Sequence, residues 1–560
     1  MVTNILVGSG SMEILLLILT TTLVATLSPL LTFAHLWQIK EWRVDRLLTH
    51  LQEEGWLRQV FGVVRPLVIL VFLCLALFFQ LPSVTRGQGM LPTWPEWMLL
   101  ALLALDLLFC LQLLLGRQPR TVWTMKATVL VTASLLLDTL IVVTATMDDW
   151  HLVIFSPLLV LLQPFILALT YGLFWPVDHF LKLQIIRRAT TLREQFPDLT
   201  VIGITGSVGK TTTKELLAHI LAERHPIVTP AHMNADIGIA RWLIRELEIA
   251  NCELRITAHK NAPNESPITN RKSQILIAEM GAYRSGEIAL LCRILKPSIG
   301  IITFIGTQHL ALFGSAQALC KAKAELFDAL PLEGHAFLNA DSVSCAHLRD
   351  HCHCPVTTVG TGGISDVKAT DIEEVPTGIS FKVDGTRFVI PLHGTHNVTN
   401  VLLAIACAMQ LGVMLETIAQ RLLTFAPPSR TFQVREDHGV RILDDTHNSS
   451  AASFKAAIAW ARTQPENQKI LLCSGLIELG EEQERTHAEL GAFASGIFQR
   501  AIFLHLRSGE QFAKGFGNDV EILSKKNLPV PPGSLLVCVG RMGPEVIRRL
   551  LSVASVSLRN

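Results

Sequence analysis

The pattern of hydrophobic and polar residues changes abruptly near residue 175. The first part of the chain holds five long apolar runs, at about 12–34, 61–81, 97–115, 126–146 and 152–174. Each is close to the ~20 residues that a helix needs to cross the hydrocarbon core of a membrane. The first run is no signal peptide, because no basic segment precedes it, no small-residue cleavage site follows it and more apolar runs come after it. The pattern predicts a membrane domain of about five transmembrane helices, followed by a soluble α/β protein.

Positive charges are unevenly shared among the segments between these runs. Segment 35–65 carries five Lys and Arg residues, segment 82–96 carries one, and segment 147–151 carries none. Lys and Arg concentrate on the cytoplasmic side of membrane proteins. The chain is therefore expected to be a multi-pass protein of the cytoplasmic (inner) membrane, with its N-terminus outside and everything after about residue 176 in the cytoplasm.

Two further features stand out in the apolar part. Asp106 and Asp138 fall inside predicted spans, where an acid is costly. Such residues serve a function, lie near a helix end, or form a hydrogen bond with a neighbouring helix. Segment 36–60 mixes charged residues with Trp and Leu, which favours an amphipathic helix lying in the membrane interface.

Composition bears on the kinds of partner and on the redox compartment to be expected for this protein. The formal net charge of +1 over 560 residues gives no indication of a nucleic-acid partner. The eleven Cys residues follow no framework spacing, so reduced thiols are expected, as in the cytosol. The run His351-Cys-His-Cys354 has the composition of a metal cluster. Adjacent ligands do not easily close a tetrahedral zinc site, so we expect no structural zinc there.

The most informative motif is the glycine-rich run from Gly203 to Lys214. An apolar strand, Val201–Ile204, leads into a loop whose backbone N–H groups can form a nest for phosphate oxygens. Lys210 can reach the β- and γ-phosphates of a nucleotide, and the Thr211 hydroxyl can ligate Mg²⁺. The run therefore predicts a nucleotide-binding P-loop.

The glycine spacing makes this motif specific. The common P-loop has a glycine five residues before Gly209, and that position is Ile204 here. The pattern is instead G-x-x-G-x-x-G-K-T-T. We expect the following helix to open at Glu215.

Two buried strands follow the P-loop along the chain. Ile275–Gly281 carries a carboxylate, Glu279, at its end, and Ile299–Ile305 is followed by His309. Segment 251–273 is polar and without periodicity, so it is expected to be a surface insertion. Because strands alternate with helices, the sheet should be largely parallel, and chemistry gathers at the carboxyl ends of such strands. The P-loop, Glu279 and His309 could therefore converge on one nucleotide.

These residues resemble the Mur ligases and, within them, the D-alanyl-D-alanine-adding branch. The resemblance runs from about Val201 to Gly491. The matching motifs, in chain order, are the P-loop, Asn234 with Ile237–Ala240, Ala278–Glu287, Gln308–Leu310 with Phe313 and Gly314, Ala322–Glu325, Leu338–Asp341, Gly394–Asn400, Arg430, Asp444 with Asp445, Ile477–Glu481 and His487–Gly491.

The resemblance implies a set of site residues and cofactors. ATP and two Mg²⁺ ions are expected, with Lys323 carbamylated and helping to hold the second ion. The implied catalytic residues are Lys210, Lys323 and His309. The implied metal ligands are Thr211, Glu279, His309 and Lys323. The implied nucleotide contacts are Gly206, Ser207, Gly209, Lys210, Thr211, Thr212, Asn397, Asn400, Arg430 and Asp445.

The hydrophobic pattern predicts a transmembrane domain at residues 1–175 and a basic linker at 176–199. The resemblance implies a P-loop, parallel-sheet ATP-binding domain at 200–426 and a smaller, Rossmann-like α/β domain at 427–560. Three departures from the family stand out. The domain that holds the UDP end of the substrate is replaced by the apolar runs, and Thr446–Ser450 and Cys538–Met542 differ from the family motifs. The ATP machinery is therefore expected to be retained, with altered sites for the acceptor and the amine.

Together these features predict a membrane-anchored, ADP-forming ligase that joins a carboxylate to an amine through an acyl phosphate. The expected partners are the bilayer, a small-molecule or lipid-linked carboxylate acceptor, and an amino acid or dipeptide amine. Two alternatives remain. A P-loop ATPase of a transport or export system would turn over ATP without an amine acceptor. A nucleotide-binding pseudoenzyme scaffold would not need Lys210, Glu279, His309 and Lys323 together.

Overall fold

The chain forms two compact units, Met1–Leu181 and Lys182–Asn560. The computed structural model describes residues 9–79, 94–116, 118–148, 156–231, 233–258, 274–306, 313–447, 449–476, 479, 482–517, 520–522 and 530–556. Each unit is considered by itself below. The four-part domain division stays a prediction.

The first unit has a helix at each of the five apolar runs. These helices are α1 (Ser9–Ile39), α4 (Val64–Phe79), α6 (Trp94–Leu114), α7 (Met125–Asp148) and α8 (Ser156–Glu194). A Leu-rich run with few polar side chains satisfies its backbone groups internally as a helix, which lipid requires. Among the described residues, three stretches are long and apolar enough to cross a membrane: Leu16–Ile39, Met125–Ala145 and Ser156–Glu194. Val64–Leu75 and Leu99–Leu114 are shorter apolar stretches, so five crossings stay a prediction.

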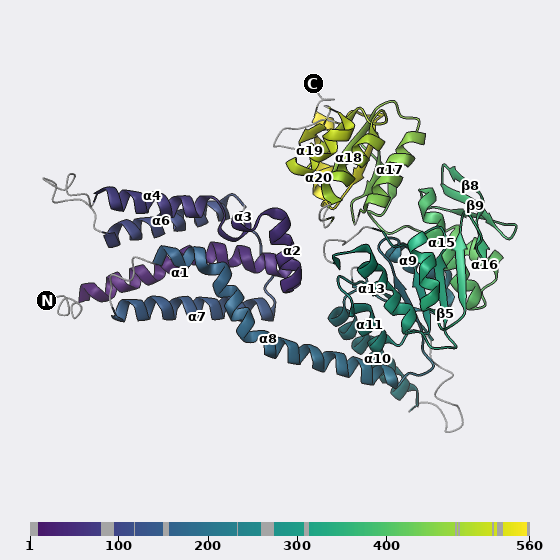
Figure 1. Ribbon diagram of the computed structural model, residues 1–560, viewed down its shortest axis with the longest axis horizontal. Helices are drawn as coiled ribbons and strands as arrows, with labels where there is room; N and C mark the ends of the chain where they lie inside the picture. Colours follow the sequence, from purple (N-terminus) through teal and green to yellow (C-terminus); the bar gives the residue numbers. More distant parts are fainter. Residues whose placement is uncertain are drawn as a thin grey trace. The chain divides into compact units, whose positions relative to one another are not determined.

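Helix α1 is central to the packing of this unit. It packs against α6 and α7, and α4 packs against α6 (Figure 1). The segment predicted to be interfacial forms α2 (Val44–Glu54) and α3 (Trp56–Phe61). Leu47 is buried there, whereas Leu48 and Trp56 are each more than half exposed. Apolar side chains of this segment are thus both buried and exposed. That the segment lies in the membrane interface stays a prediction.

Helix α8 continues past the apolar run as one helix as far as Glu194, through the segment 176–199 that was predicted as a linker. Its last turn is fixed by Arg193, which is only 4% exposed. The guanidinium donates from Nε to the Leu295 carbonyl at 2.9 Å and from Nη2 to the Leu199 carbonyl at 3.0 Å. The end of α8 is therefore built into the second unit.

The second unit is centred on a seven-stranded sheet in the order β2-β3-β1-β4-β5-β6-β7. Every neighbouring pair is parallel, so the predicted parallel sheet is confirmed. The strands are β1 (Thr200–Thr205), β2 (Ile227–Val228), β3 (Ile275–Glu279), β4 (Ile299–Ile302), β5 (His335–Asn339), β6 (Val356–Gly360) and β7 (Val367–Lys368).

Helices cover both faces of this sheet, because strand residues point alternately to either side. Ile202 and Ile204 pack toward α9 (Lys210–Ile220), α15 (Val398–Gln410) and α16 (Leu415–Leu422). Val201 packs toward α10 (Asp236–Ala258), α11 (Glu287–Leu295) and α13 (Ala316–Asp328) on the other face. Loops rather than helices lie at the carboxyl ends of the strands, and the candidate site lies there.

Three element boundaries differ from the sequence-based expectation. Helix α9 begins at Lys210, not Glu215, because Gly209 provides a left-handed turn at φ 86° and Thr212 and Thr213 are buried by packing. Strand β4 ends at Ile302, because Thr303 turns its hydroxyl to the Val208 carbonyl in the P-loop. Helix α10 extends through the first part of the expected insertion, where Glu, Leu and Arg favour helix. The rest of that insertion, 259–273, lies outside the described residues.

Two further sheets complete the unit. β8 (Thr370–Val375), β9 (Gly378–Val383) and β10 (Thr386–Ile390) form an antiparallel sheet that was not predicted. The C-terminal sheet has the order β11-β12-β16-β13-β14-β15 and is parallel except for β11. Its strands are β11 (Gln433–Asp437), β12 (Val440–Asp445), β13 (Lys469–Cys473), β14 (Arg500–Phe503), β15 (Val520–Ile522) and β16 (Leu535–Val539). One face carries α17 (Ala451–Thr463), α18 (Gln483–Ala494) and α19 (Leu506–Phe516), and the other carries α20 (Pro544–Val556).

Candidate functional site

The P-loop joins β1 to α9 and needs glycine at two of its positions. Gly206 has φ 148°, and a Cβ there would lie 2.1 Å from Thr303 Oγ1. Gly209 has φ 86°, and a Cβ there would lie 2.2 Å from Asn400 Oδ1. Any larger residue would push the loop away from β4 or α15. The loop is therefore held tightly over the carboxyl ends of the strands.

The Lys210 side chain folds back over this loop. Its Nζ donates to the Gly206 carbonyl at 2.8 Å and to the Ser207 carbonyl at 3.2 Å. Ser207 Oγ in turn accepts from the Gly306 N–H at 3.2 Å. Burial lowers the pKa of Lys210, and the Glu279 carboxylate opposes part of that shift. The ammonium group is thus placed above the loop, where a bound phosphate would replace the carbonyls as its partner.

Glu279 at the end of β3 faces the first turn of α9. Its Oε2 accepts from the Thr211 hydroxyl at 3.0 Å, and its Oε1 lies 3.4 Å from Asn234 Nδ2. The carboxylate is 5% exposed. Two of the residues predicted as Mg²⁺ ligands, Thr211 and Glu279, are therefore brought together. Of the other two, His309 lies outside the described residues and Lys323 lies on α13.

Lys214 is a neighbour of this carboxylate that the sequence analysis did not single out. It is fully buried, and its Nζ lies 3.6 Å from Glu279 Oε2 and donates to the Thr229 carbonyl at 2.9 Å. Thr229 Oγ1 accepts from the Glu279 N–H at 3.0 Å. Lys214 therefore fixes both ends of Glu279. The signal was present, since Lys214 follows Lys210 by four residues and so shares its face of the helix.

Lys214→Met should lower the thermal unfolding midpoint of the full chain, because it leaves the buried Glu279 carboxylate without its cation. Loss of a hydrogen-bonded charge partner costs about 1–3 kcal/mol, at about 2–4 °C per kcal/mol for a domain of this size. Mg²⁺ should restore more of the midpoint in this variant than in the wild type, and Lys214→Arg should resemble the wild type. An equal effect of Mg²⁺ on both proteins would show that Lys214 does not hold Glu279.

Lys323 lies on α13, near Lys210. It is 3% exposed, and burial, with the nearby Lys210 charge, lowers its pKa to about 7. Glu287 and Glu325 oppose this shift. With this pKa, about half of the lysine is a neutral amine at pH 7.

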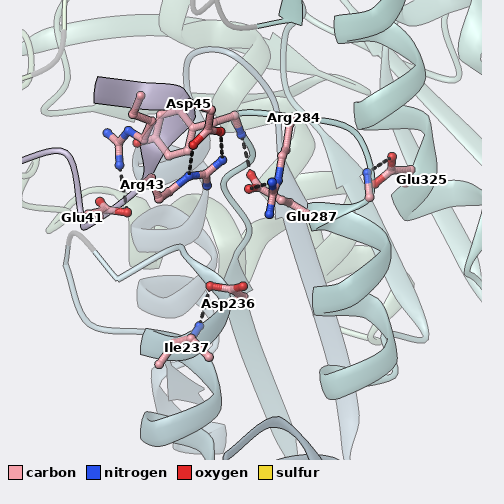
Figure 2. Close-up of polar contacts among 11 residues, drawn as sticks. Glu41, Arg43, Asp45, Asp236, Ile237, Arg284, Glu287 and Glu325 are labelled. Atoms are coloured by element: carbon pink, nitrogen blue, oxygen red, sulfur yellow. Dashed lines mark hydrogen bonds and ion pairs between the residues drawn. The ribbon is translucent and has the colours of Figure 1, made fainter. Parts of the chain in front are cut away.

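The two carboxylates near Lys323 also order the loop before α11 (Figure 2). Glu325 accepts from the Gly286 N–H at 2.6 Å and the Ala289 N–H at 3.0 Å. Glu287 accepts from the Tyr283 N–H at 2.7 Å and from Arg284 Nε at 3.2 Å. This clamp holds α11 against α13 and so fixes the wall of the site that carries Lys323.

Asn397 directly precedes α15, and Asn400 lies in the first turn of that helix, next to the P-loop. Asn400 Nδ2 donates to Asn397 Oδ1 at 3.0 Å, and Asn397 Nδ2 donates to the His393 carbonyl at 2.9 Å. The close approach of Asn400 to Gly209 places this pair next to the loop. Burial lowers the pKa of the neighbouring His396 to about 4, so that ring is neutral.

The predicted contacts of the C-terminal domain form a separate group. Arg430 donates from Nε to Thr446 Oγ1 and from Nη2 to the Thr446 carbonyl, both at 3.0 Å, and also to the Met542 carbonyl. Burial raises the pKa of Asp445 to about 6. Within the described residues neither side chain forms a hydrogen bond or ion pair with the P-loop. Arg430 has φ 62°, a left-handed conformation that costs energy for a residue with a side chain.

Several of the predicted site residues lie close together. Lys210, Thr211, Glu279 and Asn400 adjoin one loop, and Lys323 is near enough to feel the charge of Lys210. The described residues hold no group of three or more His, Cys, Asp and Glu side chains arranged for a metal ion. His351 of the His-Cys run instead contacts Asp328 at 3.0 Å.

Residues 204–408, which contain the P-loop, Glu279, Lys323 and both asparagines, match the family described as the Mur ligase middle domain. This segment is similar to a Mur ligase middle domain. The predicted relationship to the Mur ligases is thereby confirmed for the part of the chain that holds the site.

Named enzymes are similar to this chain over part of its length. The UDP-N-acetylmuramoyl-tripeptide–D-alanyl-D-alanine ligase of Bacillus subtilis is 29% identical over 320 residues, which are 56% of this chain and 64% of that protein. The enzyme of that name from Mycobacterium bovis is 34% identical over 315 residues, 53% of this chain and 56% of that protein. This chain thus spans less than two thirds of the length of these relatives. A crystal structure of MurF from Acinetobacter baumannii has a TM-score of 0.56 at 25% identity, covering 67% of this chain and 80% of that one.

Proposed function

We propose that this protein is an ATP-dependent, ADP-forming ligase that joins a carboxylate to an amine. The proposal is carried by one arrangement: Lys210, the Thr211–Glu279 pair and Lys323 gather around the P-loop of a Mur ligase middle domain. The similar enzymes are named for adding D-alanyl-D-alanine to a UDP-linked tripeptide. The same class of substrates is proposed here, with a carboxylate-bearing cell-envelope precursor and an amino acid or dipeptide as amine.

The residues present fit a nucleotide with Mg²⁺. Gly206 and Gly209 give the loop its positive-φ turns, and the loop leads directly into the N-terminus of α9, where backbone N–H groups can bind phosphate oxygens. A hydroxyl and a carboxylate, Thr211 and Glu279, meet beside it, and oxygen donors of this kind suit Mg²⁺. When bound, the ion would neutralise phosphate charge. We assign Ser207, Thr212, Asn397, Asn400, Arg430 and Asp445 to nucleotide binding, with His309 and Lys323 as further metal ligands.

The reaction class follows from the need to activate an acid in water. A carboxylate oxygen attacks the γ-phosphorus of ATP, and the bond to the β-γ bridging oxygen breaks, giving an acyl phosphate and ADP. The amine then attacks the acyl carbon, phosphate leaves, and the amine loses a proton. Catalysis of phosphoryl transfer is mostly positioning and placement of positive charge. Lys210 would supply that charge at the γ-phosphate, and Arg430 would supply more from the C-terminal domain.

Lys323 is proposed to be carbamylated. Its neutral amine would attack the carbon of CO₂ and release a proton, leaving a negatively charged carbamate. That change replaces a buried cation beside Lys210 by an anion, which would relieve the repulsion between the two lysines and provide an oxygen donor for a second Mg²⁺. Residues 427–560 are proposed to form the Rossmann-like domain that completes the site.

The acceptor is proposed to be presented at a membrane surface. Three helices are long and apolar enough to cross a membrane, and the last of them, α8, continues directly into the second unit. A lipid-linked precursor would then be held by the bilayer rather than by a domain for UDP. The proposed location is the cytoplasmic membrane, with the catalytic part in the cytoplasm.

The assay for this function uses the detergent-solubilised full chain with ATP and Mg²⁺. UDP-linked tripeptide or its lipid-linked form serves as the acid, and D-alanyl-D-alanine or single amino acids serve as the amine. ADP release that requires both the acid and the amine would support a ligase. ATP turnover that depends on neither the acid nor the amine would favour a transport ATPase. Ligation of the UDP-linked acid but not of the lipid-linked acid would contradict an acceptor presented at the membrane.

The topology makes a separate prediction. A reporter fused to the C-terminus should be active only on the cytoplasmic side, and one fused to the N-terminus only outside, since five crossings put the two ends on opposite sides. Paired reporters in intact cells measure this directly. Both ends on one side would mean an even number of crossings, and a C-terminus outside would separate the P-loop from cellular ATP.

A further inference from the structure

A cluster of hydrogen-bonding side chains lies in the first unit where α4 begins and α6 ends. Arg65 Nη2 donates to Ser28 Oγ at 3.0 Å. Ser28 Oγ lies 2.9 Å from Gln112 Oε1 and 3.2 Å from Gln118 Oε1. Gln118 Nε2 reaches back to the Ser28 carbonyl and to Thr32 Oγ1. Three helices and the segment after α6 thus meet at one cation.

Within the described part of the first unit, this cation has no acidic partner. Arg65 forms no ion pair within the described residues, and its one hydrogen bond there is to the Ser28 hydroxyl. Other basic residues of the same unit are paired: Arg43 with Asp45, Arg46 with Glu41 and Lys126 with Asp178. A partly buried charge among apolar helices is normally paired, so Arg65 is left to bind an anion from outside the chain.

The neutral side chains around Arg65 have hydrogen-bonding capacity to spare. Ser28 has one hydroxyl proton, so it can donate to Gln112 or to Gln118 but not to both. The Gln112 amide nitrogen makes no hydrogen bond within the described residues. The guanidinium on α4 and the amide N–H₂ on α6 are therefore the donors left for an anion, and Ser28 on α1 orients the guanidinium between them.

The ordinary explanation for such a residue is an arginine that extends its side chain outward to the membrane surface. That explanation predicts a guanidinium directed to solvent. Here it instead donates inward to Ser28, which is 4% exposed. The inward direction, together with two glutamines at the same point, distinguishes a built site from an arginine that only avoids lipid.

We propose that Arg65, Ser28 and Gln112 form a binding site for a phosphate monoester. Guanidinium groups match phosphate oxygens in a two-pronged arrangement. The tetrahedral phosphate can also accept from donors that are not coplanar with the guanidinium, which a flat carboxylate does less well. The ligand is a lipid headgroup or a free phosphate, and both present the same chemistry. This site is independent of the P-loop and of the proposed ligase activity.

Binding can be measured by native mass spectrometry on the full chain in a neutral detergent. Phosphatidic acid, whose headgroup is a phosphate monoester, is titrated against phosphatidylcholine, and inorganic phosphate is added as a competitor. The wild type should bind phosphatidic acid in preference. Arg65→Gln should weaken that binding by about tenfold or more, as expected for a hydrogen bond to a charged group. Arg58→Gln, which removes an exposed charge on α3, is the matched control and should change little.

Each outcome decides the proposal. Selective loss in Arg65→Gln supports it, and displacement by inorganic phosphate shows that the free anion is also a ligand, whereas resistance assigns the lipid. If Arg65→Gln does not fold, Ser28→Ala keeps the charge and should still lose affinity. The proposed site would be wrong if binding were unchanged in Arg65→Gln or in a folded Ser28→Ala. It would also be wrong if Arg65→Gln and Arg58→Gln lost equal affinity. ATP turnover of these variants should match the wild type, so failure here leaves the ligase proposal untouched.

Discussion

Lys210→Ala is expected to lower the ATP turnover of the detergent-solubilised full chain by at least about 100-fold, the effect of removing one group that stabilises charge in a transition state. The ammonium group lies over the P-loop, and its partners are two loop carbonyls, Gly206 and Ser207, which a γ-phosphate would replace. ADP release under saturating ATP and Mg²⁺ measures the loss.

The control is Lys321→Ala, which removes an exposed lysine from α13 and should leave turnover unchanged. The thermal unfolding midpoint of Lys210→Ala should stay close to that of the wild type, because Lys210 is not part of an apolar core. Turnover at the wild-type rate in Lys210→Ala would end the assignment of this loop as the ATP site.

Lys323→Ala is expected to be nearly inactive in ligation, with a loss approaching that of Lys210→Ala. The variant removes both the proposed carbamate and the anion that it would place beside Lys210. An amine attacks CO₂ only when it is unprotonated, and the pKa of about 7 makes Lys323 largely neutral above that pH and protonated below it. Wild-type activity should therefore fall as the pH is lowered through about 7, and added bicarbonate should slow that fall.

Chemical rescue separates a carbamate from an ordinary lysine. Short carboxylic acids should restore part of the activity of Lys323→Ala, because a small carboxylate can occupy the space of the missing group. They should not restore Lys210→Ala. Full activity in Lys323→Ala without any additive would show that the lysine is only a buried residue of α13, and Lys321→Ala again reports non-specific effects on that helix.

The local chemistry of the P-loop region was predictable from the sequence because it depends on short-range constraints. A buried strand, glycines at fixed spacing and a Lys-Thr pair define the loop, and the structure has β1 and α9 on either side of it. Glu279 at the end of β3 was predictable for the same reason, since parallel strands bring their carboxyl ends to one edge.

The rest depended on packing that local patterns do not express. Three consecutive threonines disfavour helix by propensity, yet α9 begins at Lys210 because Thr212 and Thr213 are buried. The spacing from Lys210 indicates the helix face of Lys214, but its burial and its contacts with Thr229 and Glu279 follow from the packing of β3 against α9. The antiparallel strands β8 to β10 lack a site motif, so nothing in the sequence analysis drew attention to them.

The last turn of α8 decides where this protein can be cut. A fragment that starts at residue 196 looks natural from the hydrophobic pattern, but it would delete Arg193 and the fully buried Ala189. The carbonyls of Leu295 and Leu199 would lose their donor, at about 1–3 kcal/mol for each buried group left unsatisfied. A fragment that starts at Lys182 keeps these groups. The usable boundary for expressing the second unit therefore lies within a helix, about three and a half turns before α8 ends at Glu194.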